Sequence, residues 1–339
     1  MPASLQQPIR TLGVVGTGVI GAGWAARALA HGLDVAAWDP APGWQERLTA
    51  AVENAWPALE QVGIYDGASL DRLQCADSLG VACKAADFIQ ESAPERLSLK
   101  QSLHEQIDAE APPAVVVASS TSGLLPTELQ SRCLHPGRLV VGHPFNPVYL
   151  LPLVEVLGGE RTSSESIDQA VTFYRYLGMH PLRVRTEIEG FLSDRLQEAL
   201  WREILHLVND DVATTEELDT AIVYGPGLRW AIMGTCLSYH LAAGDAGMED
   251  FMKHFGPALK LPWTRLEAPE LTDELIARMT EGTRQQAAGR TVKELTQLRD
   301  ECLIAIMQAL QRFDIGAGQV LAEDEARRVD KGRQPARGG

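Results

Sequence analysis

Short apolar runs alternate with amphipathic stretches over the first half of the chain. The runs are rich in Val, Leu and Ile and end at turn-forming residues, which is typical of buried strands. Between them, segments such as Trp44–Val62 and Leu97–Ala109 repeat apolar residues at the spacing of a helix. This alternation predicts a doubly wound, parallel α/β sheet. Its strands are expected at Leu12–Val15, Val35–Trp38, Phe88–Gln90, Val115–Ala118, Leu139–Gly142 and Leu153–Leu157.

The second half of the chain has the pattern of helices. One more strand is expected at Pro181–Arg185, and from Gly190 onward nearly every segment carries apolar residues three or four positions apart. Helices are expected at Ile167–Leu177, Phe191–Val208, Glu216–Tyr224, Met248–Leu259, Leu271–Ala287 and Thr291–Phe313. We therefore expect an α/β domain over residues 1–188, an all-helical domain over 189–321 and a charged, disordered tail over 322–339.

Composition narrows the class of protein. The net charge is −15 at pH 7 and the basic residues are scattered, so neither a nucleic acid nor an anionic membrane is an expected partner. The five cysteines form no C-x-x-C pair, which predicts no disulfide framework and no metal site. No apolar run approaches the roughly 18 residues of a membrane span, and the first residues do not resemble a secretion signal. A cytoplasmic protein is expected.

A glycine-rich turn joins the first expected strand to the first expected helix. Its residues are Gly16, Thr17, Gly18, Val19, Ile20 and Gly21. In this context a GxGxxG turn holds the pyrophosphate of a dinucleotide at the helix N-terminus. Asp39 ends the second strand, where its carboxylate can accept hydrogen bonds from a ribose 2′-hydroxyl and repels a 2′-phosphate. The pattern predicts a Rossmann-type domain with NAD as cofactor; a glycine turn without a ligand is the alternative interpretation.

Candidate acid–base chemistry is concentrated between residues 119 and 155. His143 lies in the sequence His-Pro-Phe-Asn-Pro, and Glu155 lies inside the apolar run Leu-Val-Glu-Val. A buried carboxylate needs a partner, and a histidine beside it can act as a general base. Ser122 lies in a Ser/Thr-rich turn and is a candidate for binding the reacting oxygen. The alternatives are a structural histidine between prolines and a serine that only caps a turn or helix.

These motifs, in this order, resemble the 3-hydroxyacyl-CoA dehydrogenase family from about Thr11 to Phe313. The motifs are Ala118-Ser-Ser-Thr-Ser-Gly, Gly142-His-Pro-Phe-Asn-Pro, Leu153-Val-Glu-Val and Gly190-Phe-Leu-Ser-Asp-Arg-Leu. The resemblance implies that His143 takes the hydroxyl proton, that Glu155 orients it and that Ser122 bonds the reacting oxygen. It also implies that Glu95 and Lys100 lie near the nicotinamide ribose. The helical domain is expected to bind substrate and to form a homodimer.

Two departures from the family pattern concern the substrate. Members that act on CoA thioesters have Asn at the position of Asp194, so a group that only accepts hydrogen bonds replaces an amide. Asp194 could serve a cationic substrate, or it could be a helix cap. Arg229 beside Trp230 offers a planar cation for a carboxylate and an aromatic face for a quaternary ammonium.

This second set of residues resembles the branch of the family that oxidises carnitine, a small zwitterion with a C3 hydroxyl. The resemblance implies oxidation of that hydroxyl to a ketone, with Arg229 on the substrate carboxylate. Further candidates for substrate contact are Phe145, Asn146, Tyr149, Trp201, Trp230 and Tyr239. The alternatives are a dehydrogenase of another small 3-hydroxy acid such as L-gulonate, a 3-hydroxyacyl-CoA dehydrogenase and an NAD-binding structural protein.

Overall fold

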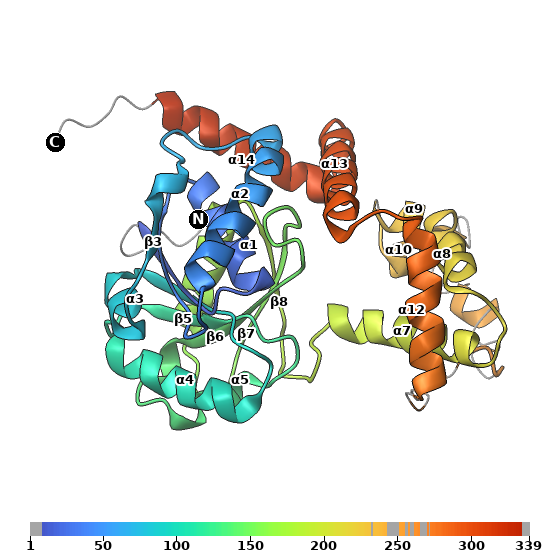
Figure 1. The fold of residues 1–339 in the computed structure, drawn as a ribbon, viewed down its shortest axis with the longest axis horizontal. Helices are drawn as coiled ribbons and strands as arrows, with labels where there is room; N and C mark the ends of the chain where they lie inside the picture. Colours follow the sequence, from blue (N-terminus) through green and yellow to red (C-terminus); the bar gives the residue numbers. More distant parts are fainter. Residues whose placement is uncertain are drawn as a thin grey trace. The chain divides into compact units, whose positions relative to one another are not determined.

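A computed structural model describes residues 9–231, 233–242, 251–254, 257, 261–264, 270 and 272–333. They divide into two units (Figure 1). The first unit holds the described residues up to Leu192 together with those from Asp300 onward, and the second unit holds those of 193–299. Helix α13 (Val292–Gln311) therefore begins in the second unit and ends in the first.

The first unit is built on one eight-stranded sheet with the strand order β3-β2-β1-β4-β5-β6-β7-β8. Neighbouring strands are parallel except for β6 and β7, which are antiparallel. The strands are β1 (Thr11–Val15), β2 (Asp34–Trp38), β3 (Leu73–Cys75), β4 (Phe88–Glu91), β5 (Val116–Ser119), β6 (Leu139–Pro144), β7 (Leu153–Gly158) and β8 (His180–Arg183). The predicted α/β fold is thereby confirmed.

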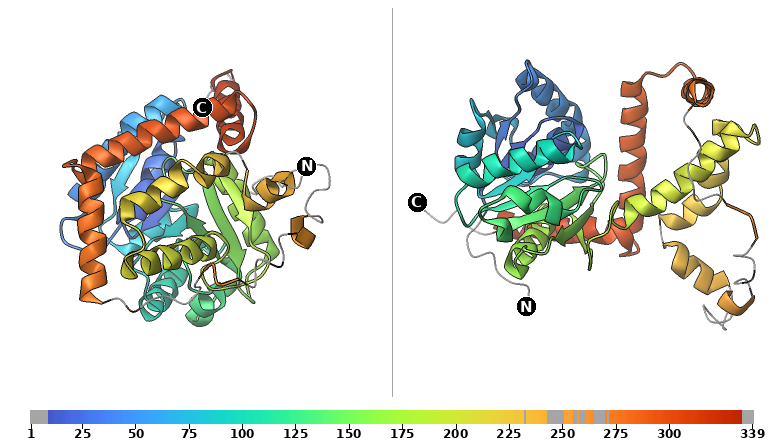
Figure 2. Two further views of the ribbon diagram at one scale, coloured as in Figure 1. Left: turned by 90° about the vertical axis from the view of Figure 1, so that its right-hand side faces the viewer. Right: turned by 90° about the horizontal axis from the view of Figure 1, so that it is seen from below.

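Helices cover both faces of the sheet (Figure 2). Successive strand residues point to opposite faces, so Val14 packs under α1 and α2 whereas Val15 packs under α3 and α4. The helices of this layer structure are α1 (Val19–Ala30), α2 (Trp44–Val62), α3 (Leu79–Ala85), α4 (Leu97–Glu110), α5 (Pro126–Leu129) and α6 (Ser164–Tyr176). Both predicted boundaries of α2 are confirmed.

The antiparallel pair is the one departure, among the described strands, from the parallel sheet that the sequence predicts. Residues 145–152 join β6 to β7, which is shorter than the dozen or more residues that a parallel crossover needs. The chain must therefore reverse direction. The sequence pattern shows two apolar strands but does not state their relative direction.

The described residues of the second unit are mainly helical. Its helices are α7 (Ser193–Asn209), α8 (Thr215–Val223), α9 (Pro226–Trp230), α10 (Thr235–Ala242), α12 (Asp273–Ala287) and the first part of α13. Leu205, Val208 and Leu275 form a small core between α7 and α12. The helix expected at Met248–Leu259 lies largely outside the described residues.

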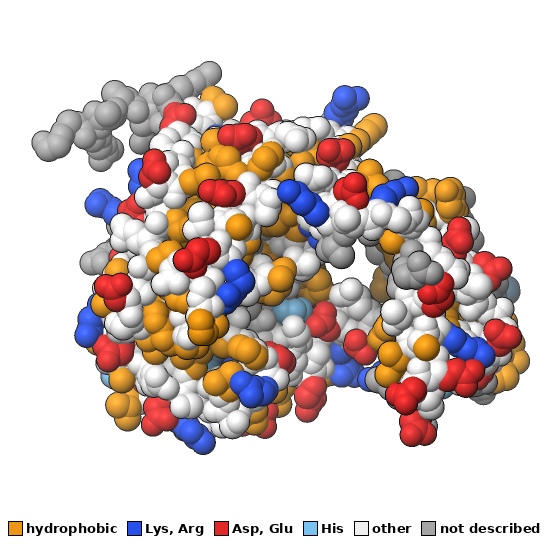
Figure 3. All heavy atoms as spheres, in the orientation of Figure 1, with side chains coloured by type: hydrophobic (Ala, Val, Ile, Leu, Met, Phe, Trp, Pro, Cys, Tyr) orange, Lys and Arg blue, Asp and Glu red, His pale blue; other side chains and the backbone are white. Residues whose placement is uncertain are grey.

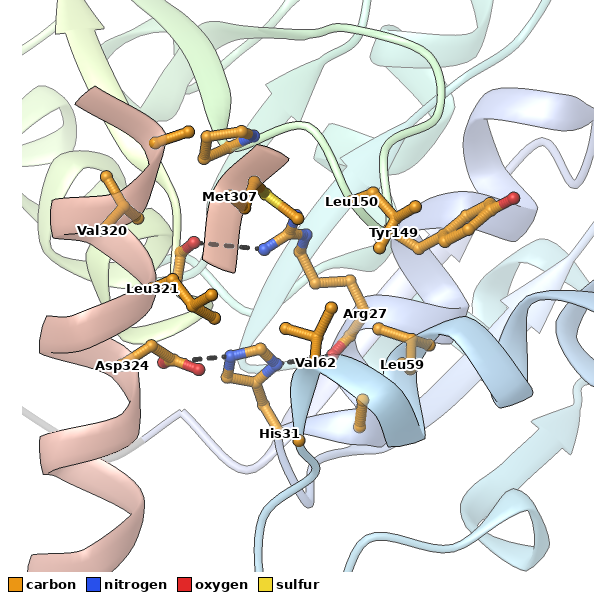
Figure 4. A pocket seen from close by; sticks show the side chains of 15 residues that line it. Arg27, His31, Leu59, Val62, Tyr149, Leu150, Met307, Val320, Leu321 and Asp324 are labelled. Carbon is orange, nitrogen blue, oxygen red and sulfur yellow. Dashed lines mark hydrogen bonds and ion pairs between the residues drawn. The ribbon is translucent and has the colours of Figure 1, made fainter. Parts of the chain in front are cut away.

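The structure corrects the expected disordered tail at 322–339 and the expected end of the helical domain at residue 321. Residues 316–333 form helix α14 (Gly316–Arg333), which belongs to the first unit together with the end of α13. Leu321 packs beside Ala58 and Leu150, while Asp324 turns inward and accepts a hydrogen bond of 2.8 Å from Tyr65. Figure 4 shows Asp324 facing His31. The segment was predicted to be disordered because of its many charged residues, but it forms an amphipathic helix. Residues 334–339 lie outside the described part of the chain.

The surface agrees with the scattered charges of the sequence. On the face that Figure 3 displays, Lys and Arg side chains are interspersed with Asp and Glu. In the described part of the chain, no helix is long and apolar enough to cross a membrane.

Candidate active site

The glycine-rich turn has the geometry that a dinucleotide requires. Gly16 has φ +90°, and a Cβ there would lie 2.7 Å from the carbonyl carbon of Ser92. A Cβ on Gly21 would lie 1.9 Å from the Gly16 oxygen, so α1 can start so close to β1 only with glycine at this position. A Cβ on Gly18 would meet nothing within 4 Å, and this open space lies at the N-terminus of α1.

Asp39 is bound to the same turn. One carboxylate oxygen accepts the Thr17 amide at 2.8 Å, and the other accepts the Ala41 amide at 2.9 Å. Each oxygen keeps a lone pair for a further donor, such as a ribose hydroxyl. The described residues at this edge of the sheet therefore fit NAD, which needs a phosphate cradle beside an acid. Among the described residues, no group of three or more His, Cys, Asp and Glu could hold a metal ion.

The antiparallel register of β6 and β7 brings the predicted acid–base pair together. His143 lies directly opposite Glu155, so both side chains point to the same face of the sheet. The His143 Nδ1 atom lies 3.0 Å from Glu155 Oε2, and the two side chains are 5% and 0% exposed. A carboxylate at Nδ1 favours the tautomer with the proton on that nitrogen and the lone pair on Nε2.

The segment after β8 completes the surroundings of this pair. The Leu192 amide donates to Glu155 Oε1 at 3.0 Å. Gly190 and Phe191 both have positive φ, at 68° and 46°, and this turn directs the Phe191 ring towards His143, with 5.6 Å between ring centroids. The predicted contact residue Phe145 also lies against His143, at 4.8 Å between ring centroids. The imidazole is therefore bounded by two aromatic rings.

Glu95 holds the turn that contains Ser122. Its Oε1 atom accepts hydrogen bonds from the Ser122 amide at 3.0 Å, from the Gly123 amide at 3.2 Å and from the Thr121 hydroxyl. Ser122 itself is exposed. The structure thus brings two predicted site residues together, and the contact of Glu95 with a nicotinamide ribose stays a prediction.

Lys100 lies in a buried cluster that the sequence did not predict. Its ammonium lies 2.7 Å from Glu91 and 3.7 Å from Glu95, and the residue is 1% exposed. Glu91 also accepts hydrogen bonds from His104 at 3.1 Å and from Ser119 at 2.6 Å. Burial alone would raise the pKa of Glu91, but the hydrogen bond from His104 and the charge of Lys100 outweigh it and lower the pKa to about 2.

A clue to this cluster was present in the sequence. Glu91 ends an apolar strand, where an acid needs a partner, and Lys100 and His104 are four residues apart on α4. Periodicity gave no reason to connect the two segments.

Two further candidates lie on the loop between β6 and β7. Asn146 is exposed. The Tyr149 hydroxyl donates to Asp300 at 2.6 Å, and its ring packs against the core cluster of Leu150, Ile304 and Met307. These contacts give Tyr149 a structural role in the first unit, and its place in an ammonium cage stays a prediction.

The remaining candidates lie in the second unit. Asp194 is in the first turn of α7, and its Oδ1 accepts a hydrogen bond from Gln197 at 3.4 Å. Arg229 and Trp230 are exposed on the short helix α9. Trp201 and Trp230 are each 43% exposed, while the Tyr239 ring stacks on Phe251 at 4.7 Å between ring centroids. Both tryptophans therefore offer aromatic surface to a ligand.

Comparison with known proteins agrees with this geometry. Residues 11–188 match the family model "3-hydroxyacyl-CoA dehydrogenase, NAD binding domain", and residues 190–289 match "3-hydroxyacyl-CoA dehydrogenase, C-terminal domain". The chain is 58% identical to L-carnitine dehydrogenase of Pseudomonas aeruginosa, over 93% of this chain and 98% of that protein. It is 60% identical to L-carnitine dehydrogenase of Pseudomonas putida, over 89% of this chain and 94% of that protein.

A solved structure is similar over both units. It is 5-formyl-3-hydroxy-2-methylpyridine 4-carboxylic acid 5-dehydrogenase, an NAD+-dependent dismutase, with a TM-score of 0.75 and 26% identity over 90% of this chain and 99% of that chain. Fold, glycine turn and sequence together define an NAD-dependent oxidoreductase. The chain belongs to the 3-hydroxyacyl-CoA dehydrogenase family.

Proposed function

We propose that this chain oxidises the C3 hydroxyl of L-carnitine to 3-dehydrocarnitine, with NAD as the hydride acceptor. The observation that carries this proposal is the 58% identity to an L-carnitine dehydrogenase over 93% of the chain. The pairing of His143 with Glu155 at 3.0 Å supplies the acid–base group that such a reaction needs. The substrate is a small zwitterion, and neither a nucleic acid nor a membrane is a partner.

His143 is the general base of the proposed reaction. Its Nε2 atom takes the proton of the C3 hydroxyl, because Glu155 keeps the other nitrogen protonated. As the imidazole becomes positively charged, the carboxylate of Glu155 stabilises it. Bound NAD supplies the chemistry of hydride acceptance.

Ser122 and Asp194 are two further residues of the proposed reaction. The Ser122 hydroxyl donates to the reacting oxygen, and its turn is supported by the bonds from Ser122 and Gly123 to Glu95. Asp194 adds a negative charge for the cationic end of the substrate, in place of the asparagine of the CoA-dependent members. Asn146 is a further candidate for contact with the substrate.

The second unit recognises the two charged ends of carnitine. The exposed guanidinium of Arg229 pairs with the carboxylate. The faces of Trp201 and Trp230, each 43% exposed, attract the trimethylammonium group. Tyr239, and Phe145 and Tyr149 of the first unit, are further candidates for contact with the ammonium group.

We also propose a cytoplasmic homodimer. The second unit exposes many large apolar side chains, among them Tyr224 (79%), Leu228 (66%) and Leu237 (51%), which a second copy would cover. The cytoplasmic location is proposed from the sequence, whose five cysteines are far apart and form no C-x-x-C pair.

A substrate panel tests the proposed function. NADH formation should occur with L-carnitine and be much weaker with D-carnitine, 3-hydroxybutyrate, L-gulonate and 3-hydroxybutyryl-CoA. No turnover of L-carnitine together with turnover of one of the other alcohols would overturn the proposal in favour of that substrate.

Arg229→Met tests the carboxylate contact. The KM for carnitine should rise roughly tenfold to a hundredfold, because a charge-assisted hydrogen bond is lost, while the affinity for NADH stays unchanged. Arg290→Met removes another exposed arginine of the second unit and serves as the matched control. An unchanged KM in Arg229→Met would remove Arg229 from the site.

A further inference from the structure

Gln90 and Glu91 are successive buried polar residues at the end of β4, and they point to opposite faces of the sheet. Gln90 belongs to a network on the α1 face. The Tyr174 hydroxyl donates to Gln90 Oε1 at 2.7 Å, and Gln90 Nε2 donates to the Gly142 carbonyl at 3.2 Å. Burial raises the pKa of Tyr174, so this phenol keeps its proton. The orientation of the Gln90 amide is therefore fixed.

The fixed amide determines the direction of the next hydrogen bond. Gln90 Nε2 donates to Ser120 Oγ at 2.8 Å, and the indole nitrogen of Trp24 donates to the same oxygen at 3.1 Å. Neither nitrogen has a lone pair that could accept a hydrogen bond, so both must donate to Ser120 Oγ. Together they fill the two acceptor positions of the Ser120 hydroxyl. Its proton must point to the remaining neighbour, Ser92 Oγ, at 2.9 Å.

Ser92 therefore accepts this bond and keeps its own proton for another acceptor. In the part of the chain that the structure describes, Ser120 Oγ is the one hydrogen-bond partner of the Ser92 hydroxyl. Ser92 is only partly buried, and its carbonyl carbon lies 2.7 Å from the position of a Cβ on Gly16. A directed donor thus lies beside the glycine turn.

The position of this donor in the sheet indicates which part of NAD it meets. Strand order reverses between β1 and β4, and a dinucleotide lies across such a switch point at the carboxyl ends of the strands. Asp39, the acid for the adenosine ribose, follows β2 on one side of β1. Ser92 follows β4 on the other side, which is the side that leads through β5 to His143 on β6.

We propose that the Ser92 hydroxyl donates a hydrogen bond to an oxygen in the nicotinamide half of bound NAD. Ser120, Gln90, Trp24 and Tyr174 are positioning residues, because they direct the Ser92 proton away from the protein. The proposal depends on NAD binding by this family and is independent of which alcohol is oxidised.

Binding of NADH and of ADP to Ser92→Ala tests the proposal. ADP shares the adenosine half of the dinucleotide and lacks the nicotinamide riboside. The Kd for NADH, measured by NADH fluorescence without substrate, should rise about threefold to tenfold, the usual effect of losing one hydrogen bond. The Kd for ADP, measured by calorimetry, should change by less than about twofold, within the spread expected of an uninvolved site.

Two more variants make the result specific. Ser92→Thr keeps the hydroxyl and should bind NADH like the unaltered protein, and Ser164→Ala, at an exposed serine at the start of α6, is the matched control. If Ser92→Ala does not fold, Ser92→Cys keeps the volume with a weaker donor and should show the same loss for NADH alone. The proposal is overturned by an unchanged Kd for NADH, by equal losses for NADH and ADP, or by a Thr variant as weak as the Ala variant.

Discussion

Two buried glutamates in the first unit each hold a histidine, and their surroundings differ. Glu155 on β7 meets His143, and its other oxygen accepts the Leu192 amide at 3.0 Å. Glu91 on β4 meets His104, and its other oxygen receives the ammonium of Lys100 at 2.7 Å. The charge of Glu91 is thus compensated by a permanent cation. A glutamate–histidine pair does not by itself make a general base.

The histidine rings differ as well. His104 uses Nε2 towards Glu91, and in the described structure its Nδ1 is buried without a hydrogen-bond partner. His143 uses Nδ1 towards Glu155, so the two rings meet their glutamates through different nitrogens. We infer that the first pair stabilises the fold and the second performs the chemistry.

Exchanging His143, the proposed general base, should have the largest effect. His143→Asn keeps a donor for Glu155 but removes the base, so kcat for carnitine should fall roughly 100- to 10,000-fold while the Kd for NADH stays constant. Steady-state kinetics and NADH fluorescence measure the two quantities. A kcat within tenfold of the unaltered enzyme would contradict the role of His143.

Glu91→Gln should mainly destabilise the fold. The substitution removes the carboxylate 2.7 Å from the buried Lys100 ammonium and leaves only the more distant, partly exposed Glu95 at 3.7 Å, so the free energy of unfolding should fall by about 3–5 kcal/mol. Urea unfolding measures the change. Lys84→Met breaks a surface ion pair whose lysine side chain is 69% exposed, and as the control it should cost about 0–1 kcal/mol.

The same variant should alter the response to acid. The pKa of Glu91 is lowered from 4.5 to about 2 in the folded protein, so its contribution is present above pH 4.5 and is lost as the pH falls towards 2. In Glu91→Gln, the loss of folding free energy between pH 4.5 and 2 that comes from Glu91 should be absent. A parallel loss of stability in both proteins between these pH values would show that Glu91 is not the titrating group.

His104→Leu should have the smallest effect. It removes one hydrogen bond to Glu91 and retains Lys100, so the free energy of unfolding should fall by about 1–3 kcal/mol and kcat should remain unchanged. His104→Gln restores a donor and should recover part of the stability. If kcat fell as far as it does in His143→Asn, the separation between the two pairs would be wrong.

The sequence determined the elements that depend on local patterns. The boundaries of α2 follow from the amphipathic spacing of Trp44–Val62, and the strands of the sheet follow from short apolar runs. The glycine turn and Asp39 were recognisable because they lie close together in the chain. The turn belongs to one strand–turn–helix unit, and Asp39 ends the strand that follows it. The identity of His143 and Glu155 as a candidate pair was also available from their motifs.

Only the tertiary structure decided which distant residues meet. It set β6 antiparallel to β7 and so placed His143 opposite Glu155. It joined Glu91 to Lys100 and His104. It also packed the charged helix α14 against the rest of the first unit. Periodicity records how a segment divides its side chains between core and solvent. It does not record strand direction, register or the partner of a buried charge, because those depend on contacts between segments far apart in the sequence.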